Sequence, residues 1–470
     1  MSSLMLNNVS IIGLGKLGAS MAAAFASRGF TVIGVDVNQS SVDAVNQGKG
    51  PVQETNLDET LFANRDRVRA TLSHEEAVIN SDISFVIVPT PSDGRGSFSL
   101  QYAEWAFKEI GKAIGQKNTY HNVVLTSTVL PGSTRQALIP VLERESGRTA
   151  GRDFGVCYSP EFIALGSIIN DFLNPDFTLI GEIDERSGSQ LEEVYSRVML
   201  NGAPAARMSL ENAELTKISI NAYVTTKITF ANMLAEICEK IPGGDVDVVT
   251  DALGLDARIG RKYLTGSIGY GGPCFPRDNL ALSFIAEKLG IRAGLAETTD
   301  FMNRTIAANI GHKILPLIRK GATVAVLGLS YKPDSHVIEE SQGVYIARHL
   351  SKNGARVVAY DPMSGEMALE ELRRDIVVLK SIAECLYHAE AVLITTPDPV
   401  FKALSAADFR NEWSEVIVFD FWRILRQQLD GQPHIKYIGT GISGDDRANT
   451  SRLRMLWWGE PGDALGTASE

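Results

Sequence analysis

The chain has 470 residues, of which 44% are hydrophobic and 21% are charged, and this composition predicts a globular protein of two or three domains. Its formal net charge of −11 comes without a basic stripe, which argues against nucleic acid and anionic membranes as partners. The N-terminus is short and polar, and no run approaches the ~20 apolar residues that span a bilayer, so we expect a cytoplasmic protein without a signal peptide. The four cysteines are scattered and form no CxxC pair, so we expect reduced thiols, no disulfide framework and no metal site.

The N-terminal region carries a glycine-rich turn between a strand and a helix. An apolar strand at residues 9–13 leads into the sequence GLGKLG, a helical run to Arg28 and a second strand at residues 31–35, which Asp36 ends. This order completes a dinucleotide-binding fingerprint, because the glycines let backbone N–H groups approach a pyrophosphate. A carboxylate at this position accepts ribose hydroxyls and repels a 2′-phosphate, which predicts NAD rather than NADP. The predicted cofactor contacts in this region are Gly13, Gly15, Lys16, Leu17, Gly18 and Asp36.

Two more apolar strands, at residues 83–89 and 123–126, each end in a polar turn. Because ligands bind at the carboxyl ends of parallel strands, Thr90 and Thr128 are candidates to line the cofactor crevice, although ordinary turn threonines would look the same. Glu161 follows another strand exit and would face the same crevice, although a lone loop glutamate is usually solvated.

The longest helical segment is predicted at residues 211–241. It carries apolar residues on several faces, which is typical of a helix buried between domains or against a second subunit. Lys217 and Asn221 are four residues apart and therefore neighbours on one face. They could be two donors for a developing oxyanion, or Lys217 could simply belong to a frayed helix start.

A glycine-rich run, GYGGPCFPRD at residues 269–278, delivers Cys274 to the expected start of a helix. Pro276 suits the first helical position, and residues 279–289 carry helical apolar spacing. A helix N-terminus favours thiolate over thiol, so Cys274 is a candidate nucleophile. The alternative is a glycine-rich turn with a buried structural cysteine.

After Gly321 a second strand–helix–strand pattern begins, without a GxGxxG signature. Strands are expected at residues 322–328, 357–360, 391–395 and 416–419, with a helix at 341–352. We therefore predict an α/β fold of two Rossmann-like doubly wound domains joined by a long central helix. The predicted division is an NAD-binding domain at 1–205, a central helical dimerisation domain at 206–310, a second Rossmann-like domain at 311–442 and a C-terminal tail at 443–470, whose Trp457–Trp458 pair could dock elsewhere.

Taken together, the motifs GLGKLG, STVLPGS, SPEF, AELTKISINAYVTTK, GYGGPCFPRD and GLSYKPD resemble the UDP-glucose/GDP-mannose dehydrogenase family, in family order, over residues 8–440. The resemblance implies NAD in the first half, a nucleotide sugar in the second and a homodimer through the central helix. It also implies oxidation of the sugar C6 alcohol to a carboxylate, with UDP-glucose as the expected substrate.

The resemblance assigns a role to each candidate catalytic residue. Cys274 falls on the nucleophile that forms a thiohemiacetal and then a thioester, and Lys217 and Asn221 fall on the groups that hold the C6 oxygen. Asp278 falls on a residue that supports water activation, Glu161 on the base for hydrolysis and Thr128 on a residue that orders the water. The implied substrate contacts are Glu161, Phe162, Lys217, Asn221, Arg258, Tyr263, Leu264, Gly271, Lys332 and Arg423, of which Arg258 is expected to reach into the partner subunit's site.

Some positions depart from the family pattern. Ala164 and Leu165 replace an arginine and a second acid of the PEFLREG sequence, so Glu161 would act without a second carboxylate. Glu339 replaces an arginine on the cofactor side, and the C-terminal arginine motif is matched only approximately around Arg423. Two alternatives stay open: a two-electron 3-hydroxyacid-type dehydrogenase, and a non-catalytic sensor of NAD and nucleotide sugars.

Overall fold

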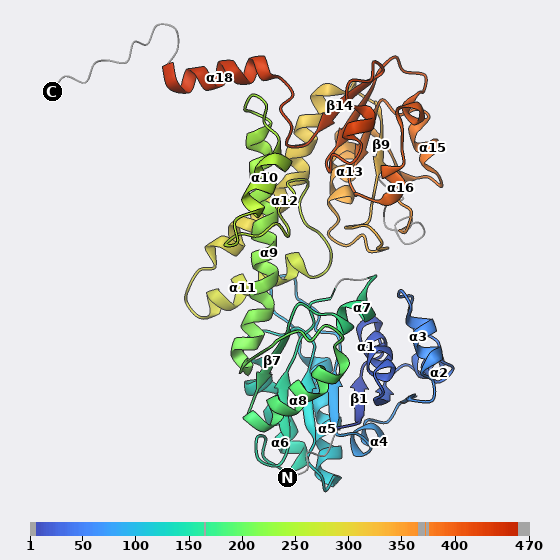
Figure 1. The fold of residues 1–470 in the computed structure, drawn as a ribbon, viewed down its shortest axis with the longest axis vertical. Helices are drawn as coiled ribbons and strands as arrows, with labels where there is room; N and C mark the ends of the chain where they lie inside the picture. The colour runs from blue at the N-terminus through green and yellow to red at the C-terminus, as the bar shows by residue number, and fades with distance from the viewer. Residues whose placement is uncertain (1–5, 164–165, 365–371, 373–375, 459–470) are drawn as a thin grey trace, which may run out of the picture. The chain divides into compact units, whose positions relative to one another are not determined.

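The computed structural model describes residues 6–163, 166–364, 372 and 376–458. The chain divides into two compact units, residues 1–220 with 281–292 and residues 221–280 with 293–470. Figure 1 traces them from blue at the N-terminus to red at the C-terminus. Within the described ranges, no helix combines the length and the apolar character that crossing a membrane requires.

In the described part of the first unit, eight strands form one sheet in the order β3-β2-β1-β4-β5-β6-β7-β8. The pairings are parallel except for β6 with β7, which is antiparallel. The strands are β1 (Asn8–Ile12), β2 (Thr31–Val35), β3 (Val68–Thr71), β4 (Ile83–Val86), β5 (Asn122–Leu125), β6 (Gly155–Tyr158), β7 (Thr178–Glu182) and β8 (Ala205–Ser209). The helices are α1 (Lys16–Ser27), α2 (Gln39–Asn46), α3 (Leu57–Ala63), α4 (His74–Ile79), α5 (Gln101–Gln116), α6 (Ile139–Ser146), α7 (Ile168–Leu173) and α8 (Glu185–Val198), with a π-helical turn, η1 (Ser133–Leu138), ahead of α6.

Both faces of this sheet are covered, which is why the inner strands β4, β5 and β6 are buried at every position rather than alternating. Along β1, Val9 and Ile11 enter one core with α1, whereas Ile12 enters a second core with α5 on the other face. All three side chains are at most 2% exposed. The strand expected at residues 83–89 ends at Val86, and the Val88 N–H bonds to the Ser127 side chain instead of to a neighbouring strand.

In the described part of the second unit, six parallel strands follow the order β11-β10-β9-β12-β13-β14. They are β9 (Thr323–Leu327), β10 (Arg356–Tyr360), β11 (Val377–Val378), β12 (Ala391–Ile394), β13 (Val416–Asp420) and β14 (Ile435–Gly439). The helices here are α10 (Val246–Gly254), α12 (Gly294–Ile314), α13 (Gln342–Lys352), α15 (Ile382–Leu386), α16 (Pro399–Lys402) and α17 (Arg426–Leu429), with short 3₁₀ turns η2 (Leu315–Leu317) and η3 (Ala406–Phe409). The predicted fold class, two doubly wound α/β domains with a long helix between them in sequence, is confirmed.

Two helices have residues in both units. Helix α9 (Leu210–Cys238) has 29 residues and ends three residues earlier than expected, where the chain turns through residues 239–244. Helix α11 (Phe275–Lys288) begins one residue after Cys274. Beyond β14, the predicted tail contains a further helix, α18 (Asp446–Trp458), whose Asn449 donates to the carbonyl of Glu239 at 3.0 Å. Trp457 on α18 is 74% exposed.

Candidate active site

The glycine turn after β1 has one open glycine between two crowded ones. A Cβ on Gly13, whose φ is +101°, would stand 2.1 Å from the Ile87 carbonyl oxygen, and a Cβ on Gly18 would stand 1.8 Å from that of Gly13. No atom lies within 4 Å of a Cβ built on Gly15. Gly13 and Gly18 therefore let α1 pack on the strand end, whereas Gly15 leaves room for a ligand to approach the backbone.

The surroundings of this turn suit an anionic dinucleotide. Helix α1 begins at Lys16 with no acidic residue in its first turn and, among the described residues, no side chain that caps it. Its first N–H groups can therefore meet a pyrophosphate. The Asp36 carboxylate accepts from the Leu14 N–H at 2.7 Å and the Asn38 N–H at 2.8 Å, which fixes its orientation and leaves lone pairs for ribose hydroxyls.

Thr90 and Thr128 are brought together, as the strand order requires. The Thr90 hydroxyl donates to the Thr128 carbonyl at 2.7 Å. Ser127 adds a second tie, since its hydroxyl accepts from the Val88 N–H at 2.9 Å and donates to the Val88 carbonyl at 2.6 Å. The loop after β5 is thus joined to the loop after β4, and Thr90 is engaged in the protein itself.

Lys217 lies with Glu161 and Phe162. Its Nζ donates to the Glu161 carbonyl at 2.6 Å and stands 4.4 Å from the centre of the Phe162 ring. Lys217 is 8% exposed and seven residues inside α9, so the frayed-start alternative does not describe it. Burial raises the pKa of the Glu161 carboxyl to about 7, against the opposing effects of the Lys217 charge and a hydrogen bond from the Tyr195 hydroxyl. A carboxyl that is half ionised near neutral pH is suited to general-base catalysis.

Asn221 and Asp278 form a second pair. The Asn221 side-chain amide donates to Asp278 Oδ2 at 2.6 Å, and Arg277 pairs with Asp278 Oδ1 at 3.1 Å. Asp278 is fully buried, and its N–H closes the first turn of α11 on the Cys274 carbonyl. Cys274 is exposed, unlike Cys157, Cys238 and Cys385, which are buried. The alternative of a buried structural cysteine does not describe it.

The glycines before Cys274 are packed against residues 331–340. The Gly272 N–H donates to the Glu339 carbonyl at 3.0 Å, and a Cβ on Gly272 would stand 2.7 Å from the Tyr331 ring. A Cβ on Gly271 would stand 2.4 Å from the Glu340 carbonyl oxygen. Close approach of another segment, rather than flexibility, therefore requires glycine here. The Glu339 side chain, at one of the departures from the family pattern, is exposed.

The remaining predicted substrate contacts differ in their surroundings. Tyr263 has a φ of +67°, is 50% exposed and meets Phe275 edge-on, with ring centres 6.4 Å apart. Leu264 is buried, and Lys332 lies with its Nζ 6.0 Å from the Tyr331 ring centre. Arg258 is highly exposed, and within the described residues its ion pair is with its near neighbour Asp256. Its predicted reach into a partner subunit stays a prediction.

Arg423 is surrounded by protein groups. Its side chain is 2% exposed, and its Nε and Nη2 hold the two oxygens of Asp247 at 2.7 and 2.8 Å. The same guanidinium donates to the carbonyls of Thr265, Gly266 and Thr440 at 2.8 to 2.9 Å. We interpret Arg423 as a residue that holds the segment after Tyr263 and Leu264 in place. Direct contact between Arg423 and a substrate would require these hydrogen bonds to break.

Two residues that contact predicted site residues were not predicted from the sequence. Tyr195 and Tyr331 contact the predicted site through Glu161 and Gly272, and no local spacing pointed to either. Ala164 and Leu165, the other departures from the family pattern, lie outside the described residues.

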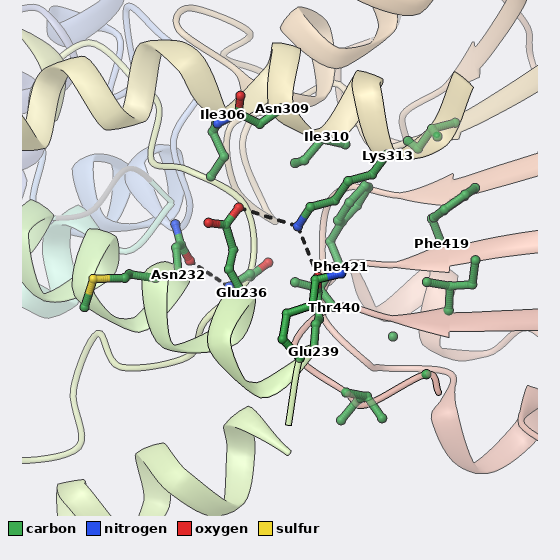
Figure 2. Close-up of a pocket in the computed structure, with 18 of the residues that line it drawn as sticks. Asn232, Glu236, Glu239, Ile306, Asn309, Ile310, Lys313, Phe419, Phe421 and Thr440 are labelled. Carbon is green, nitrogen blue, oxygen red and sulfur yellow. Dashed lines mark hydrogen bonds and ion pairs between the residues drawn. The ribbon is translucent and has the colours of Figure 1, made fainter. Parts of the chain in front are cut away.

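A pocket of about 380 Å³ lies in the second unit, lined by α9, α12 and the β13–β14 region (Figure 2). Lys313 crosses it to pair with Glu236 and Glu239, at 3.5 and 3.1 Å. None of the predicted site residues lines this pocket, so it is not part of the candidate active site.

Family models match three successive parts of the chain. These are the UDP-glucose/GDP-mannose dehydrogenase family NAD binding domain at residues 7–199, the central domain at 211–305 and the UDP binding domain at 325–427. The chain belongs to the UDP-glucose/GDP-mannose dehydrogenase family. The predicted family and the predicted cofactor, NAD, are confirmed.

Relatives within the UDP-glucose/GDP-mannose dehydrogenase family act on different nucleotide sugars. The UDP-glucose 6-dehydrogenase of Haloferax volcanii is 34% identical over 435 residues, covering 90% of this chain and 98% of the relative. The GDP-mannose 6-dehydrogenase of Pseudomonas aeruginosa is 37% identical over 359 residues, covering 75% and 80%. The structure of a UDP-glucose dehydrogenase from Pyrobaculum islandicum superposes with a TM-score of 0.83 at 33% identity, covering 94% of this chain and 99% of that one. Membership thus identifies a nucleotide-sugar 6-dehydrogenase family without fixing the sugar or the base.

Proposed function

We propose that this chain oxidises UDP-glucose at C6 to UDP-glucuronate through a thioester on Cys274. The overall change converts one alcohol, two NAD⁺ and one water into a carboxylate, two NADH and three protons. NAD⁺, when bound, supplies the hydride acceptor for each of the two oxidations. The residues that would hold it are the glycines of the turn after β1, with Asp36 for the ribose and Thr90 beside the strand end.

The observation that carries this proposal is the combination of Cys274 and Asp278. Cys274 is exposed directly before α11, and the fully buried Asp278 on the first turn of α11 is bonded to Asn221. An alcohol dehydrogenase that stops at the aldehyde has no need of a thiol, whereas oxidation to the acid needs a nucleophile that turns the aldehyde into a hydride donor. The Cys274 sulfur adds to the aldehyde carbon, and loss of the second hydride leaves the thioester.

The second set of groups supports the proton transfers and the hydrolysis. Lys217 and Asn221, one turn apart on α9, would donate to the C6 oxygen as it gains negative charge. Glu161, with a pKa of about 7, takes the proton from the water that cleaves the thioester. Thr128 orders that water. The products of this step are the carboxylate and the free Cys274 thiol.

We favour UDP-glucose over other nucleotide sugars for two reasons. The UDP-glucose dehydrogenases of Haloferax volcanii and Pyrobaculum islandicum are covered over 98% and 99% of their lengths, and the third family model is a UDP binding domain. The sequence before the nucleophile also reads Pro273–Cys274, whereas the N-acetyl-sugar branch of the resemblance has a histidine before its cysteine. The loop with Tyr263, Leu264 and Gly271 and the side chain of Lys332 would hold the nucleotide sugar.

We also propose a homodimer through α9. Tyr223, Phe230 and Ile237 recur at seven-residue spacing, which places them on one stripe of this helix. They are 62%, 45% and 49% exposed in the single chain. A stripe of exposed apolar side chains along one helix is typical of a surface that a second protein chain covers. Phe230→Glu together with Ile237→Glu should halve the mass measured by sedimentation, and an unchanged dimer would contradict this face. The cytoplasmic location stays a prediction.

The test is a stoichiometric assay of the purified protein with NAD⁺ and a panel of UDP- and GDP-sugars. Two NADH per UDP-glucose, with acid as product, support the proposal. Turnover confined to GDP-mannose or to an N-acetyl sugar would overturn the substrate, and one NADH with free aldehyde would overturn the thioester route. NAD binding without turnover of any sugar would favour the sensor alternative.

Cys274→Ser provides the matching control. The variant should bind NAD⁺ and UDP-glucose as the wild type does and form no acid, because a neutral hydroxyl is a far weaker nucleophile than a thiolate. Full acid formation by this variant would exclude the covalent mechanism.

A further inference from the structure

Glu214 on α9 is a buried carboxylate that bonds to the backbone of another segment. It is fully buried, and each of its oxygens accepts one N–H: Oε2 from Gly132 at 2.6 Å and Oε1 from Thr134 at 2.8 Å. Burial raises the pKa of the Glu214 carboxyl, against the effect of the hydrogen bonds from Thr134 and Gly132. A charge in this position needs those bonds, because an unpaired buried carboxylate is strongly unfavourable.

The two N–H groups belong to a special part of the chain. Gly132 has a φ of +91° and precedes η1, the π-helical turn that continues into α6. The N–H groups at such a helix start have no partner within the helix, so an external acceptor fixes the start in place. Glu214 therefore anchors the end of the 127–132 loop.

This loop is also held at its other end. Ser127 bonds to the backbone of Val88, and the Thr128 carbonyl accepts from Thr90. With the Glu214 bonds, residues 127–134 are tied to the strand β4 exit on one side and to α9 on the other. Lys217 is three residues beyond Glu214 in α9, so the helix that carries Lys217 also fixes the loop that carries Thr128.

A nearby glutamate on α9 provides a contrast. Glu211, one turn earlier, pairs with Arg135 at 2.5 Å, and both side chains are more than a third exposed. That pair lies in solvent and contributes little. Glu214 forms no ion pair within the described residues and is held by the backbone N–H groups of Gly132 and Thr134. On the same helix, Glu211 thus forms a partly exposed ion pair, whereas Glu214 is buried and holds another segment of the backbone.

We propose that Glu214 is a positioning residue, which sets the place of Thr128 relative to α9 and so controls hydrolysis of the thioester. This inference rests on the proposed function. Glu214 does not touch the substrate or the cofactor in this role. Its effect is on the step for which Thr128 orders the water, not on binding.

The experiment compares Glu214→Gln with Glu211→Gln in the full chain. A glutamine keeps the shape of residue 214 but turns one oxygen into a donor that faces an N–H. We expect kcat for acid release to fall on the order of tenfold or more in Glu214→Gln, while KM for UDP-glucose and NAD⁺ stays within about twofold. The acylated Cys274 should accumulate and appear in the intact mass, and Glu211→Gln should behave as the wild type. Equal effects of the two substitutions, or a fall in kcat without the acylated species, would overturn the proposal.

Hydrogen exchange tests the same inference without turnover. Amides in residues 127–138 should exchange faster in Glu214→Gln than in Glu211→Gln, whereas those in β1 should not differ. If the wild type lacks turnover, the proposed function fails while this measurement still decides the anchor. If Glu214→Gln does not fold, Glu214→Asp replaces it, because aspartate keeps the charge on a shorter side chain. Amides in residues 127–138 should then exchange faster in Glu214→Asp than in Glu211→Gln. Unchanged exchange at residues 127–138 in the folded variant would overturn the proposal.

Discussion

The six-stranded sheet repeats the order of the first six strands of the eight-stranded sheet, and both share one glycine contact, yet the turns after their equivalent strands β1 and β9 differ. In each, the glycine after the central strand has a positive φ, +101° at Gly13 and +113° at Gly328. In each, a second glycine packs on that residue's carbonyl: a Cβ would stand 1.8 Å away at Gly18 and 2.4 Å away at Gly343. The helix thus meets the strand end in the same way in both halves.

The turns differ in length and in how the helix start is capped. Helix α1 begins three residues after Gly13, whereas α13 begins 14 residues after Gly328. The Ser341 side chain accepts from the Val344 N–H and so caps α13 itself, while α1 has no such cap in the described residues. Of these two helix starts, only that of α1 lacks a side-chain cap in the described residues, which agrees with an anion site predicted in the first half.

The two halves also differ at the acid that follows the second strand, which is Asp36 after β2 and Asp361 after β10. Asp36 accepts two backbone N–H groups and is half-buried. Asp361 is 7% exposed and accepts from the N–H groups of Leu329, Ser330, Met363 and Ser364 and from the Ser330 hydroxyl. Both acids thus bond to their own turns, and Asp361 accepts more bonds from its turn than Asp36 does.

The largest expected difference between the halves is catalytic. Glu161 in the first unit and Asp420 in the second each follow or end a strand, and burial raises both pKa values. Asp420 is held by the Leu425 N–H and the Tyr437 hydroxyl, whereas the Glu161 carboxylate accepts, among the described residues, one long bond from Tyr195 at 3.4 Å. We expect Glu161→Gln to slow acid release by about 10²- to 10⁴-fold and Asp420→Asn to leave the pH profile unchanged.

The sign of the pH effect follows from the base role. Glu161 acts as the carboxylate, so acid release should rise with pH up to about 7 and then level off. Steady-state rates between pH 5 and 9, with a trap for the acylated enzyme, measure it. A rate that falls with rising pH through this range would contradict the assignment.

Asp361→Ala should destabilise the second unit by about 3 kcal/mol, because it leaves several buried donors without an acceptor. Asp36→Ala should cost less than about 1 kcal/mol and should weaken NAD⁺ binding on the order of tenfold. Chemical denaturation and NAD⁺ titration of both variants check this. Equal losses of stability would remove the contrast between the two acids.

The shared glycine contact can be broken in either half. Gly18→Ala and Gly343→Ala should each cost about 1 to 3 kcal/mol, since the added methyl meets a backbone carbonyl that cannot move away. Only Gly18→Ala should also weaken NAD⁺ binding. A Gly343→Ala variant that loses NAD⁺ affinity would show that the halves are not separate in function.

The smallest effect is expected at Gly15. A Cβ there meets no atom, so Gly15→Ala should leave the stability within about 0.5 kcal/mol of the wild type. It should nevertheless weaken NAD⁺ binding by roughly tenfold, because the methyl stands where the backbone must approach the pyrophosphate. Calorimetric titration, with thermal melting as the control, separates the two outcomes.

The first half was readable from the sequence because its chemistry is local. A strand, three glycines at fixed spacing and an acid after the next strand lie within 30 residues, and each residue type follows from a steric or electrostatic need. The apolar strands and the long helix were also predicted, since burial on both faces leaves a continuous hydrophobic pattern. Helix α18 was not, because its sequence is polar and its contact with Glu239 involves a backbone carbonyl.

The missing parts of the candidate site share one cause. Within the described residues, Arg423 bonds to four backbone carbonyls and Glu214 to two backbone N–H groups, and such partners leave no residue signature. Tyr331 lies against Gly272, which is 59 residues away, so no period of a helix or a strand relates them. A sequence pattern shows how apolar and polar side chains recur along a helix or strand. Contacts with backbone groups depend instead on the path of the main chain in the folded protein, which the pattern does not show.

Because Tyr331 packs on Gly272, two residues before Cys274, its pKa depends on the charge of the Cys274 sulfur. Burial raises the pKa of Tyr331 to about 12, and the negative charge of the Cys274 thiolate adds to the shift. Electrostatic coupling is reciprocal, so any change that neutralises the sulfur must ease the ionisation of the ring. Acylation, alkylation or the serine substitution should all move the ultraviolet titration of this tyrosine toward lower pH. We therefore expect the titration of Tyr331 to differ between the free and the acylated Cys274.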